Sequence, residues 1–470
     1  MTLDPVDVIL VLAYFAGILY IGFRAGKHRT RNADDFFLAG RTLTLPFFIA
    51  SLVSTWYGGI LGVGEFSYRF GISNWIVFGV PYYIFAAVFA IVLAKKIRET
   101  NLATIPDKLE ASYGKPTALL GSVLTFVLVT PAAYVLMLGV LVQLLFGFPL
   151  AVSVILSTFV TIVYLHSGGF RSGVWVNAFE FVLMFLGFAL MVAIAARAYG
   201  GWEFIQANVP PLHLTWHGGN AWQYIAVWFF IALWTLVDPA FHQRCYAAKD
   251  GKTARKGIML SIAFWFCFDF LTTTTGLYAR ALLPGLDEPM FSYPLLAEAV
   301  LPSVAKGLFT IGMLATIMSS LSSLMFISAM TVGKDIVGRL VPPERSERVA
   351  KRWTKIGLLV GGGFAIGLAL LVPSVVSIWY TVGTTIIPGL LVPVLAGYFE
   401  SLRIPRSFAF VAMLLGWLTS SGSLIYGTVF SADGQTYWFG IEPMYPGLTV
   451  SLLVWALGRL RAATGTKGAG

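Results

Sequence analysis

The chain has 470 residues, of which 57% are hydrophobic and only 11% are charged, and its mean hydropathy is +0.80. Soluble domains carry about 25% charged residues, so this composition excludes an ordinary water-soluble fold and indicates a protein embedded in a bilayer. The formal net charge of +10 is then explained by basic loops on the cytoplasmic side of the membrane, without a surface for nucleic acid.

Apolar segments recur along the whole chain. Because a membrane-spanning helix needs about 20 mainly apolar residues, the sequence predicts an all-α membrane protein with about 13 spans. No polar stretch between them is long enough for a further domain, so residues 1–470 are expected to form a single transmembrane domain. The predicted spans are 5–24, 43–68, 73–95, 117–146, 149–166, 172–199, 220–240, 256–282, 301–333, 354–372, 375–398, 405–430 and 442–460.

The first predicted span does not read as a cleaved signal peptide. Asp4 and Asp7 precede it while Arg24 and Lys27 follow it, which is the reverse of the charge order of a signal peptide. Thirteen spans that begin outside would place 28 of the 32 Lys and Arg residues in cytoplasmic segments, Arg29, Arg31 and Lys467 among them. This bias predicts an N-terminus outside and a C-terminus in the cytoplasm.

Two of the predicted spans contain helix-breaking residues. In the second, Tyr57 is followed by Gly58 and Gly59, and in the seventh Asp238 is followed by Pro239. Unwound backbone persists at membrane depth only where it is buried in protein or lines a cavity. Two breaks five spans apart predict an inverted repeat of 5+5 helices, spans 2–6 (43–199) and spans 7–11 (220–398), with peripheral spans at 5–24 and 405–460. The alternative is that the glycines only permit close helix packing.

Four motifs accompany these spans. They are Asp35–Arg41 (DFFLAGR), Thr104–Asp107 (TIPD), Gln243–Lys249 (QRCYAAK) and Ser319–Ser323 (SSLSS). In this order and at these spacings they resemble the sodium:solute symporter family. The resemblance implies the leucine-transporter-like inverted-repeat fold and, in function, sodium-coupled uptake of a small polar solute by alternating access across a bacterial inner membrane. It implies Na⁺ as the coupling ion and no other cofactor.

The serine motif is the expected centre of ion binding. On a helix, residues three or four positions apart share one face, and this holds for Thr316, Ser319, Ser320 and Ser323. The resemblance implies a sodium site with the hydroxyls of Ser319 and Ser320 and the backbone carbonyls of Thr316, Ser54 and Tyr57. Without the resemblance, the serines would be expected only to pack and to bond back to the preceding turn.

Some family members hold a second sodium through the next serine pair and an aspartate in the sixth span. Ser322 and Ser323 are present here, but the aspartate position holds Asn177 and the following family glutamine is replaced by Glu180. A neutral amide is a weaker ligand, and Glu180 can either restore the charge or bind a proton. The resemblance therefore implies a possible second ion site at Asn177, Glu180, Ser322 and Ser323.

The solute is expected near the bilayer midplane, where the broken helices meet. Aromatic side chains enclose a small solute and offer hydrogen-bonding groups, although in membrane proteins they also serve packing. Asp238 can attract a cationic group of the solute or cap the segment that follows it. The predicted solute-binding residues are Trp56, Gly58, Gly59, Tyr82, Tyr134, Trp234, Asp238 and Tyr380.

Other functions are weaker readings of the sequence. A proton-coupled carrier of the same fold would use Glu180, Asp238 and Asp269 as relays, whereas a membrane sensor would need a signalling domain that the chain does not show. The sequence contains no phosphate-binding loop and no convergent catalytic group, so it does not indicate an enzyme. Its histidines do not have the spacing of metal ligands, so it does not indicate a site for a metal other than Na⁺. The expected partners are the solute, sodium and the lipid bilayer, and a monomer is sufficient.

Overall fold

A computed structural model describes residues 3–27, 33–431 and 437–465. Within these ranges the chain is helical, with one isolated β-bridge between Leu43 and Ala248. This confirms the all-α prediction. Arg29, Arg31 and Lys467, three of the predicted cytoplasmic charges, lie outside the described residues.

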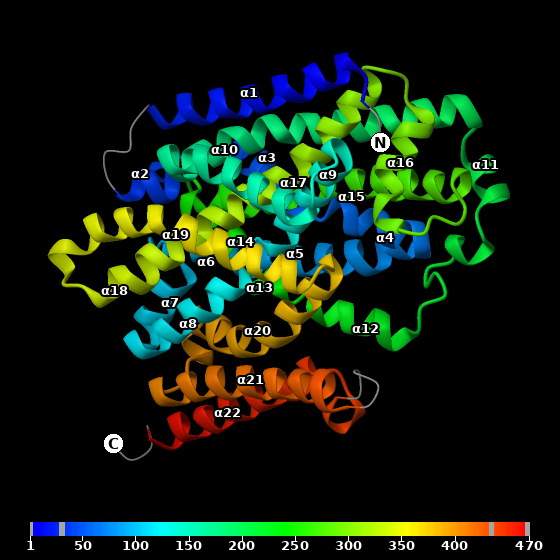
Figure 1. Cartoon of the computed structure of the whole chain (residues 1–470). Coiled ribbons are helices and arrows are strands. Elements are labelled where there is room, and N and C mark those ends of the chain that lie inside the picture. The colour runs from blue at the N-terminus through cyan, green and yellow to red at the C-terminus, as the bar shows by residue number, and fades with distance from the viewer. Residues whose placement is uncertain (1–2, 28–32, 432–436, 466–470) are drawn as a thin grey trace.

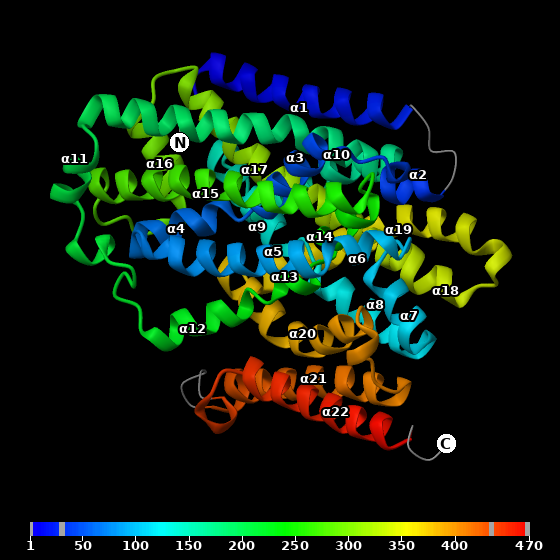
Figure 2. The same ribbon diagram turned by 180° about the vertical axis from the view of Figure 1, so that it is seen from behind.

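The long helices run side by side (Figures 1 and 2). Helix α1 (Pro5–Lys27) lies along α10 (Leu150–Tyr199) at one edge of the bundle, and α21 (Arg406–Ile425) and α22 (Met444–Gly465) form the opposite edge. The other helices are α2 (Ala33–Leu38), η1 (Ala39–Arg41), α3 (Leu45–Trp56), α4 (Ile60–Phe70), η2 (Trp75–Gly79), α5 (Val80–Val92), α6 (Ala94–Glu99), α7 (Ile105–Tyr113), α8 (Lys115–Leu128), α9 (Ala132–Phe146), α11 (Trp202–Asn208), η3 (Pro211–Leu214), α12 (Trp222–Ile231), α13 (Trp234–Val237), α14 (Pro239–Ala247), α15 (Gly251–Leu282), η4 (Pro289–Phe291), α16 (Ser292–Val300), α17 (Ala305–Met330), η5 (Thr331–Val337), α18 (Gly338–Leu340), α19 (Pro343–Leu371), α20 (Val375–Gly397), η6 (Glu400–Leu402), η7 (Tyr426–Phe430) and η8 (Trp438–Gly440).

Ten helices among the described residues are long and apolar enough to cross a membrane, or 11 when the bent pair α3–α4 is counted as one span. The predicted count of 13 is not confirmed. The predicted span 149–166 is the part of α10 before a kink at Gly169, where φ is 59°, and its apolar stretch, Leu150–Val163, is short. The predicted span 442–460 falls in α22, which is helical but is not among the ten.

The two predicted breaks lie where the sequence placed them. Helices α3 and α4 meet at an angle of 59°, with residues 57–59 between them. At the second break, Asp238 has an extended backbone (φ −67°, ψ 117°) between α13 and α14. Its Oδ1 accepts hydrogen bonds from the backbone N–H groups of Ala240 (2.6 Å) and Phe241 (3.3 Å). Asp238 therefore caps α14, which is one of the two roles that the sequence suggested for it.

The glycines at the first break permit close approach by two other helices. A Cβ on Gly58 would lie 2.0 Å from Oγ of Ser320 on α17, and a Cβ on Gly59 would lie 2.2 Å from Cη2 of Trp379 on α20. Any other residue would force α17 or α20 away, because such distances are far inside van der Waals contact. The non-helical segment 57–59 is therefore wedged between these two helices.

Helix α17 forms the centre of the bundle, and nearly all its residues are buried. It packs along α10, and the closest approach is between two glycines, where a Cβ on Gly187 would lie 3.1 Å from Cα of Gly312. Small residues at such a crossing let the two backbones touch, which supplies van der Waals attraction where lipid removes the hydrophobic driving force.

Replacing Gly187 with Val is expected to destabilise the protein by about 1–3 kcal/mol, because the added atoms push α10 from α17. The thermal unfolding temperature of the purified protein would fall. Gly173→Val on the same helix is the matched control, because a Cβ there meets no atom within 4 Å. An equal fall in both variants would contradict the packing role of Gly187.

Candidate functional site

A cluster of buried oxygen atoms joins the first break to the central helix. The hydroxyl of Ser319 lies 2.9 Å from the carbonyl oxygen of Ser54 and 2.9 Å from that of Thr316. The hydroxyl of Ser320 donates to the carbonyl of Thr55 and lies 3.4 Å from that of Ser54. The serine and threonine side chains of this cluster, the oxygen cluster, are at most 4% exposed.

The oxygen cluster contains neutral hydroxyls and carbonyls and no charged side chain, which is the ligand type that discontinuous membrane helices offer to sodium. It brings together Ser54, Thr316, Ser319 and Ser320, which are four of the five residues of the predicted sodium site. It also includes the carbonyl of Thr55, which the sequence did not indicate. Tyr57 stands at the C-cap of α3, and its side chain turns to α15, where its hydroxyl lies 2.7 Å from Oγ1 of Thr272.

A cavity of about 140 Å³ lies between the two breaks. Its wall comes from α3, α4, η2, α5, α8, α9, α12, α13, α14, α15, α17 and α20, with the segments between them, and nine of its 25 lining residues are aromatic. The lining residues are Leu52, Thr55, Trp56, Tyr57, Gly59, Val63, Phe78, Tyr82, Leu128, Val129, Thr130, Tyr134, Trp228, Ile231, Trp234, Thr235, Asp238, Pro239, Ala240, Phe241, Asp269, Leu324, Ile378, Trp379 and Val382.

Most of the predicted solute-binding residues lie on this cavity. The exceptions are Gly58, which faces Ser320 and Tyr134, and Tyr380, whose hydroxyl donates to Glu442. Trp379, the neighbour of Tyr380, lines the cavity instead, because the helical turn of α20 presents only one of two adjacent residues to a given side. The predicted residues that line it are Trp56, Gly59, Tyr82, Tyr134, Trp234 and Asp238.

Asp269 of α15 also lines the cavity, although the sequence suggested it only as a proton relay. Its carboxylate accepts hydrogen bonds from the hydroxyls of Tyr57 and Tyr83. Tyr57 therefore links the first break to α15. No local pattern around Asp269 marks it as part of a cavity, because its neighbours there come from α3 and α5.

The residues of the possible second ion site separate into two places. Asn177 lies against α17, with Nδ2 at 2.9 Å from Oγ of Ser323 and Oδ1 at 3.4 Å from Oγ of Ser322. Glu180 instead faces the peripheral helix α1, where its Oε1 accepts a hydrogen bond of 2.9 Å from Tyr14. Helix α10 packs against both α17 and α1, so two side chains about 60° apart around its axis meet different neighbours.

Arg244, predicted to lie in a cytoplasmic loop, is instead fully buried in α14. Its guanidinium lies beside Asn177, and its Nη2 lies 2.6 Å from Oγ1 of Thr55 and 3.1 Å from Oγ of Ser323. The prediction failed because the sequence alone gives no sign that α14 continues inward after the break at Asp238.

The model of the sodium:solute symporter family matches residues 36–416, which include both breaks, the oxygen cluster and the cavity.

The chain belongs to the sodium:solute symporter family.

Two relatives illustrate this membership. The sodium/pantothenate symporter of Escherichia coli (strain K12) is 25% identical to this symporter, over 96% of each chain. The sodium/proline symporter of Staphylococcus aureus (strain JH9) is 25% identical over 95% of this chain and 91% of that protein. Family membership and the apolar helices make the chain a multi-pass transporter of the bacterial plasma membrane and not an enzyme.

Solved structures share the fold of this family member. The substrate-bound, outward-open structure of a Na⁺-coupled sialic acid symporter superimposes with a TM-score of 0.79 at 18% identity, over 98% of both chains. A nucleobase-cation-symport-1 family transporter, closed with bromovinylhydantoin bound, gives a TM-score of 0.60 at 12% identity, over 92% of this chain and 95% of that one.

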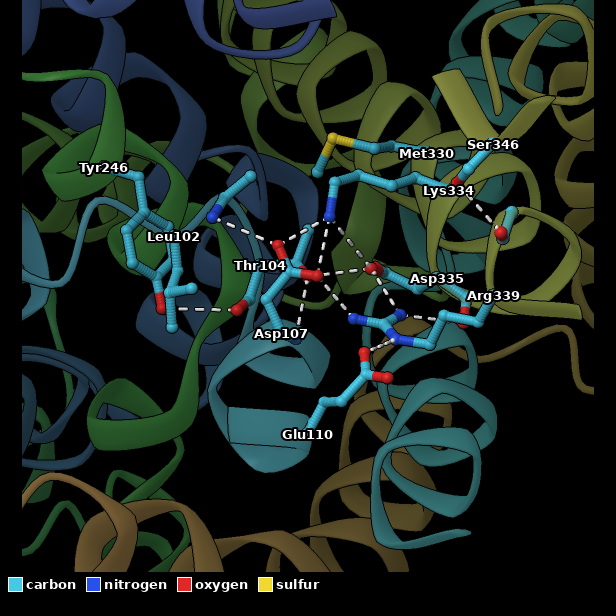
Figure 3. A network of polar contacts seen from close by, with 12 residues as sticks. Leu102, Thr104, Asp107, Glu110, Tyr246, Met330, Lys334, Asp335, Arg339 and Ser346 are labelled. Carbon is cyan, nitrogen blue, oxygen red and sulfur yellow. Dashed lines mark hydrogen bonds and ion pairs between the residues drawn. The ribbon is translucent and has the colours of Figure 1, made fainter. Parts of the chain in front are cut away.

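A network of ion pairs joins α7 to η5 and α18 (Figure 3). Asp107 on α7 lies 2.6 Å from Nζ of Lys334 on η5 and also accepts from Arg339 on α18. Arg339 in turn pairs with Glu110 (2.8 Å) and with Asp335 (2.8 Å). The TIPD motif therefore anchors α7 to the end of the central helix α17.

The same network extends to the second broken helix. The hydroxyl of Thr104 donates to Asp335 at 2.7 Å, and its carbonyl accepts from Tyr246 of α14 at 3.3 Å. The Tyr246 hydroxyl lies 2.7 Å from that of Tyr398, which follows α20. Elements that carry the cavity wall are thus tied together at this end of the bundle.

Asp107 gives the network a pH dependence. Burial by itself would raise the pKa of the Asp107 carboxyl, but the positive charges of Lys334 and Arg339 outweigh burial and hold that pKa below its ordinary value. A carboxyl with a lowered native pKa stabilises the fold above its unfolded pKa of about 3.9 and loses that contribution as pH falls through the native value.

Asp107→Asn is therefore expected to lower the thermal unfolding temperature at pH 5–8, with a difference from wild type that shrinks as pH falls below about 4. Unfolding scans from pH 7 to pH 3 would measure it. Glu110 pairs with the same arginine, but its side chain is 42% exposed. Glu110→Gln should therefore lower the unfolding temperature by less than Asp107→Asn does. A difference between Asp107→Asn and wild type that stays constant across this range would contradict the assignment.

Proposed function

We propose that this protein carries a small polar solute into the cell together with sodium by alternating access. The observation that supports the proposal is the oxygen cluster, because its ligands come from the broken helix on one side and from α17 on the other. The cluster is directly beside the cavity, since Thr55 contributes its carbonyl to Ser320 and also lines the cavity wall. An ion at the cluster and a solute in the cavity would share one segment of backbone.

A bound sodium ion would tether α3 to α17. Its proposed ligands are the hydroxyls of Ser319 and Ser320 and the carbonyls of Thr316, Ser54 and Tyr57. That tether would fix the unwound segment 57–59, and with it the cavity wall. The membrane potential can drive uptake of the solute against its gradient, because one sodium charge that moves through 100 mV contributes about 2.3 kcal/mol. Sodium is therefore proposed as the coupling ion.

The proposed architecture is that of the sequence analysis: 13 spans, with the repeats 43–199 and 220–398 and peripheral spans at 5–24 and 405–460. The beginning of α1 and the end of α22 lie at opposite ends of the helices (Figure 1), which an odd number of spans requires. We place the N-terminus outside and the C-terminus in the cytoplasm, so that the network around Asp107 lies at the cytoplasmic end. Inward opening would then require that network to loosen.

A proton-coupled carrier of the same fold is the second candidate. It is favoured by Glu180, whose Oε2 is buried and has no hydrogen-bond partner among the described residues. An ionisable side chain buried within a membrane span is a candidate proton carrier. Asp269 and Asp238 would be the further relays.

Sodium is expected to raise the thermal unfolding temperature of the purified protein relative to potassium at equal ionic strength. Binding to the folded state alone contributes about 2.7 kcal/mol at 100 times the dissociation constant. The double variant Ser319→Ala/Ser320→Ala should lose this rise.

Ser328→Ala is the matched control, because Ser328 is buried on the same helix and its hydroxyl has no hydrogen-bond partner in the described structure. It should keep the sodium response. A wild-type protein that responds to pH but not to sodium would overturn the proposal and support proton coupling instead.

A further inference from the structure

The cavity wall is acidic and aromatic, with no basic side chain. Asp238 and Asp269 are its charged lining residues, and neither lysine nor arginine is among the residues that form the described wall. Arg244 lies behind the wall, where Nη1 donates to the carbonyl of Ala240 at 3.1 Å and Nη2 to that of Ser51 at 3.1 Å. A solute that is only an anion would meet carboxylates here without a partner of opposite charge.

Asp238 is positioned to receive a positive group. Its Oδ1 is held by the two backbone N–H groups that begin α14, whereas Oδ2 accepts no hydrogen bond from the described residues. The carboxylate is not fully buried, and it lines the cavity. One oxygen therefore fixes the side chain, and the other is available to a ligand.

Aromatic rings surround the same space. Trp56 lies against Tyr82 with ring centroids 5.2 Å apart, and Tyr134 lies against Trp379 at 6.3 Å. Faces of tryptophan and tyrosine attract cations through the ring quadrupole, most strongly where water is excluded. Aromatic rings with a carboxylate are the chemistry that recognises an ammonium group.

Polar atoms without partners complete the wall. The hydroxyls of Thr130 and Thr235 and Nε1 of Trp228 are buried, and none has a hydrogen-bond partner in the described structure. All three residues line the cavity and are at most 6% exposed. Buried polar groups are normally satisfied, so these atoms indicate a ligand with hydrogen-bonding groups beside its cation.

We propose that the transported solute carries an ammonium group, quaternary or substituted, which binds between Asp238 and the rings of Trp56, Tyr82 and Tyr134. This rests on the proposed symport function and names its substrate class. An engineered apolar cavity of about 150 Å³ holds benzene, so a cavity of about 140 Å³ fits a small solute of roughly six non-hydrogen atoms.

The test is thermal unfolding of the purified full chain in sodium, with choline, glycine betaine and proline as ammonium probes, lactate as an anion and ribose as a neutral polyol. At least one ammonium probe should raise the unfolding temperature, and lactate and ribose should not. Asp238→Asn should lower the binding affinity for that probe at least about 10-fold, and Trp56→Leu should lower it about 2- to 30-fold.

Asp238→Asn should keep the fold, because asparagine caps helices as well as aspartate does. Asp250→Asn is the matched control, since Asp250 caps α15 through the N–H of Thr253 (2.6 Å) far from the cavity, and its probe response should equal that of wild type. Stabilisation by lactate or ribose alone, no response to any ammonium probe, or a response unchanged in Asp238→Asn would overturn the proposal. A missing sodium effect without solute would instead overturn sodium symport itself.

The buried guanidinium of Arg244 supports a separate inference about the number of ions. Among the ion pairs of the described residues none includes Arg244, which donates to Oγ1 of Thr55 and Oγ of Ser323. The amide of Asn177 donates to the same two hydroxyls, at 3.0 Å and 2.9 Å. The two hydroxyls also lie 2.8 Å from each other, so one of them donates to the other. The donors from Arg244 and Asn177 already use the lone pairs of both oxygens, which leaves none for a metal ion.

We infer that Arg244 and Asn177 occupy the place of a second cation, so that this symporter binds one sodium ion per cycle. A permanent positive charge beside Ser323 repels a second ion, and the neutral Asn177 supplies no carboxylate to hold one. The inference rests on sodium symport and replaces the possible second ion site at Asn177, Ser322 and Ser323 with a contact made by the chain itself.

Equilibrium binding of radioactive sodium to the purified protein tests this count. About one ion per chain is expected, with a Hill coefficient near 1, and Ser323→Ala should leave the count unchanged. The double variant Asn177→Asp/Arg244→Gln should gain a second ion, because a carboxylate would then face Ser322 and Ser323 without a competing cation. Two ions in wild type, with one lost in Ser323→Ala, would overturn the inference, and no bound ion would overturn sodium symport and this inference with it.

Discussion

A segment of unwound backbone inside the bundle governs the rest of this structure. Residues 57–59 leave the helical ladder at membrane depth, where no water can satisfy the freed carbonyl and N–H groups. Protein must therefore enclose the segment, and it does so from two sides, with Ser320 of α17 against Gly58 and Trp379 of α20 against Gly59. The serine hydroxyls that satisfy the freed carbonyls are also the oxygen atoms suited to an alkali cation.

The same enclosure places the cavity beside the oxygen cluster. Thr55 belongs to both, and Tyr57 reaches across to Asp269 on α15. The second break repeats the arrangement, since Asp238 holds the first N–H groups of α14 with one oxygen and faces the cavity with the other. A change in the position of α3 would thus move the ion ligands and the cavity wall together, which is the physical requirement for coupling two ligands.

Charge inside the bundle follows a consistent pattern. The oxygen cluster is neutral, the cavity is acidic, and the buried base Arg244 lies between them among hydroxyls and carbonyls. A further group of charged side chains lies at one end of the bundle, where Asp107, Asp335, Lys334 and Arg339 neutralise one another. Buried charges are tolerated there because each has partners, whereas Asp238 and Arg244 lack a partner of opposite charge at ion-pair distance in the described structure. We relate this difference to function: paired charges stabilise the fold, Asp238 keeps one oxygen available to a ligand, and Arg244 is engaged by the hydroxyls of Thr55 and Ser323.

The sequence by itself determined the membrane class, the helical fold, both breaks and the family. These follow from local properties, because apolar length, glycine, proline and a hydroxyl spacing of one helical face act within one turn or one span. It also indicated Trp56, Trp234 and Asp238, which are close to the breaks, and Tyr82 and Tyr134, which are aromatic residues of the third and fourth predicted spans. It could not decide which face of α20 turns inward, that Thr55 offers its carbonyl, that Glu180 faces α1, or that Arg244 is buried. Only the tertiary structure decided these points, because each depends on which helix packs against which, and residues more than 60 positions apart in the chain make those contacts.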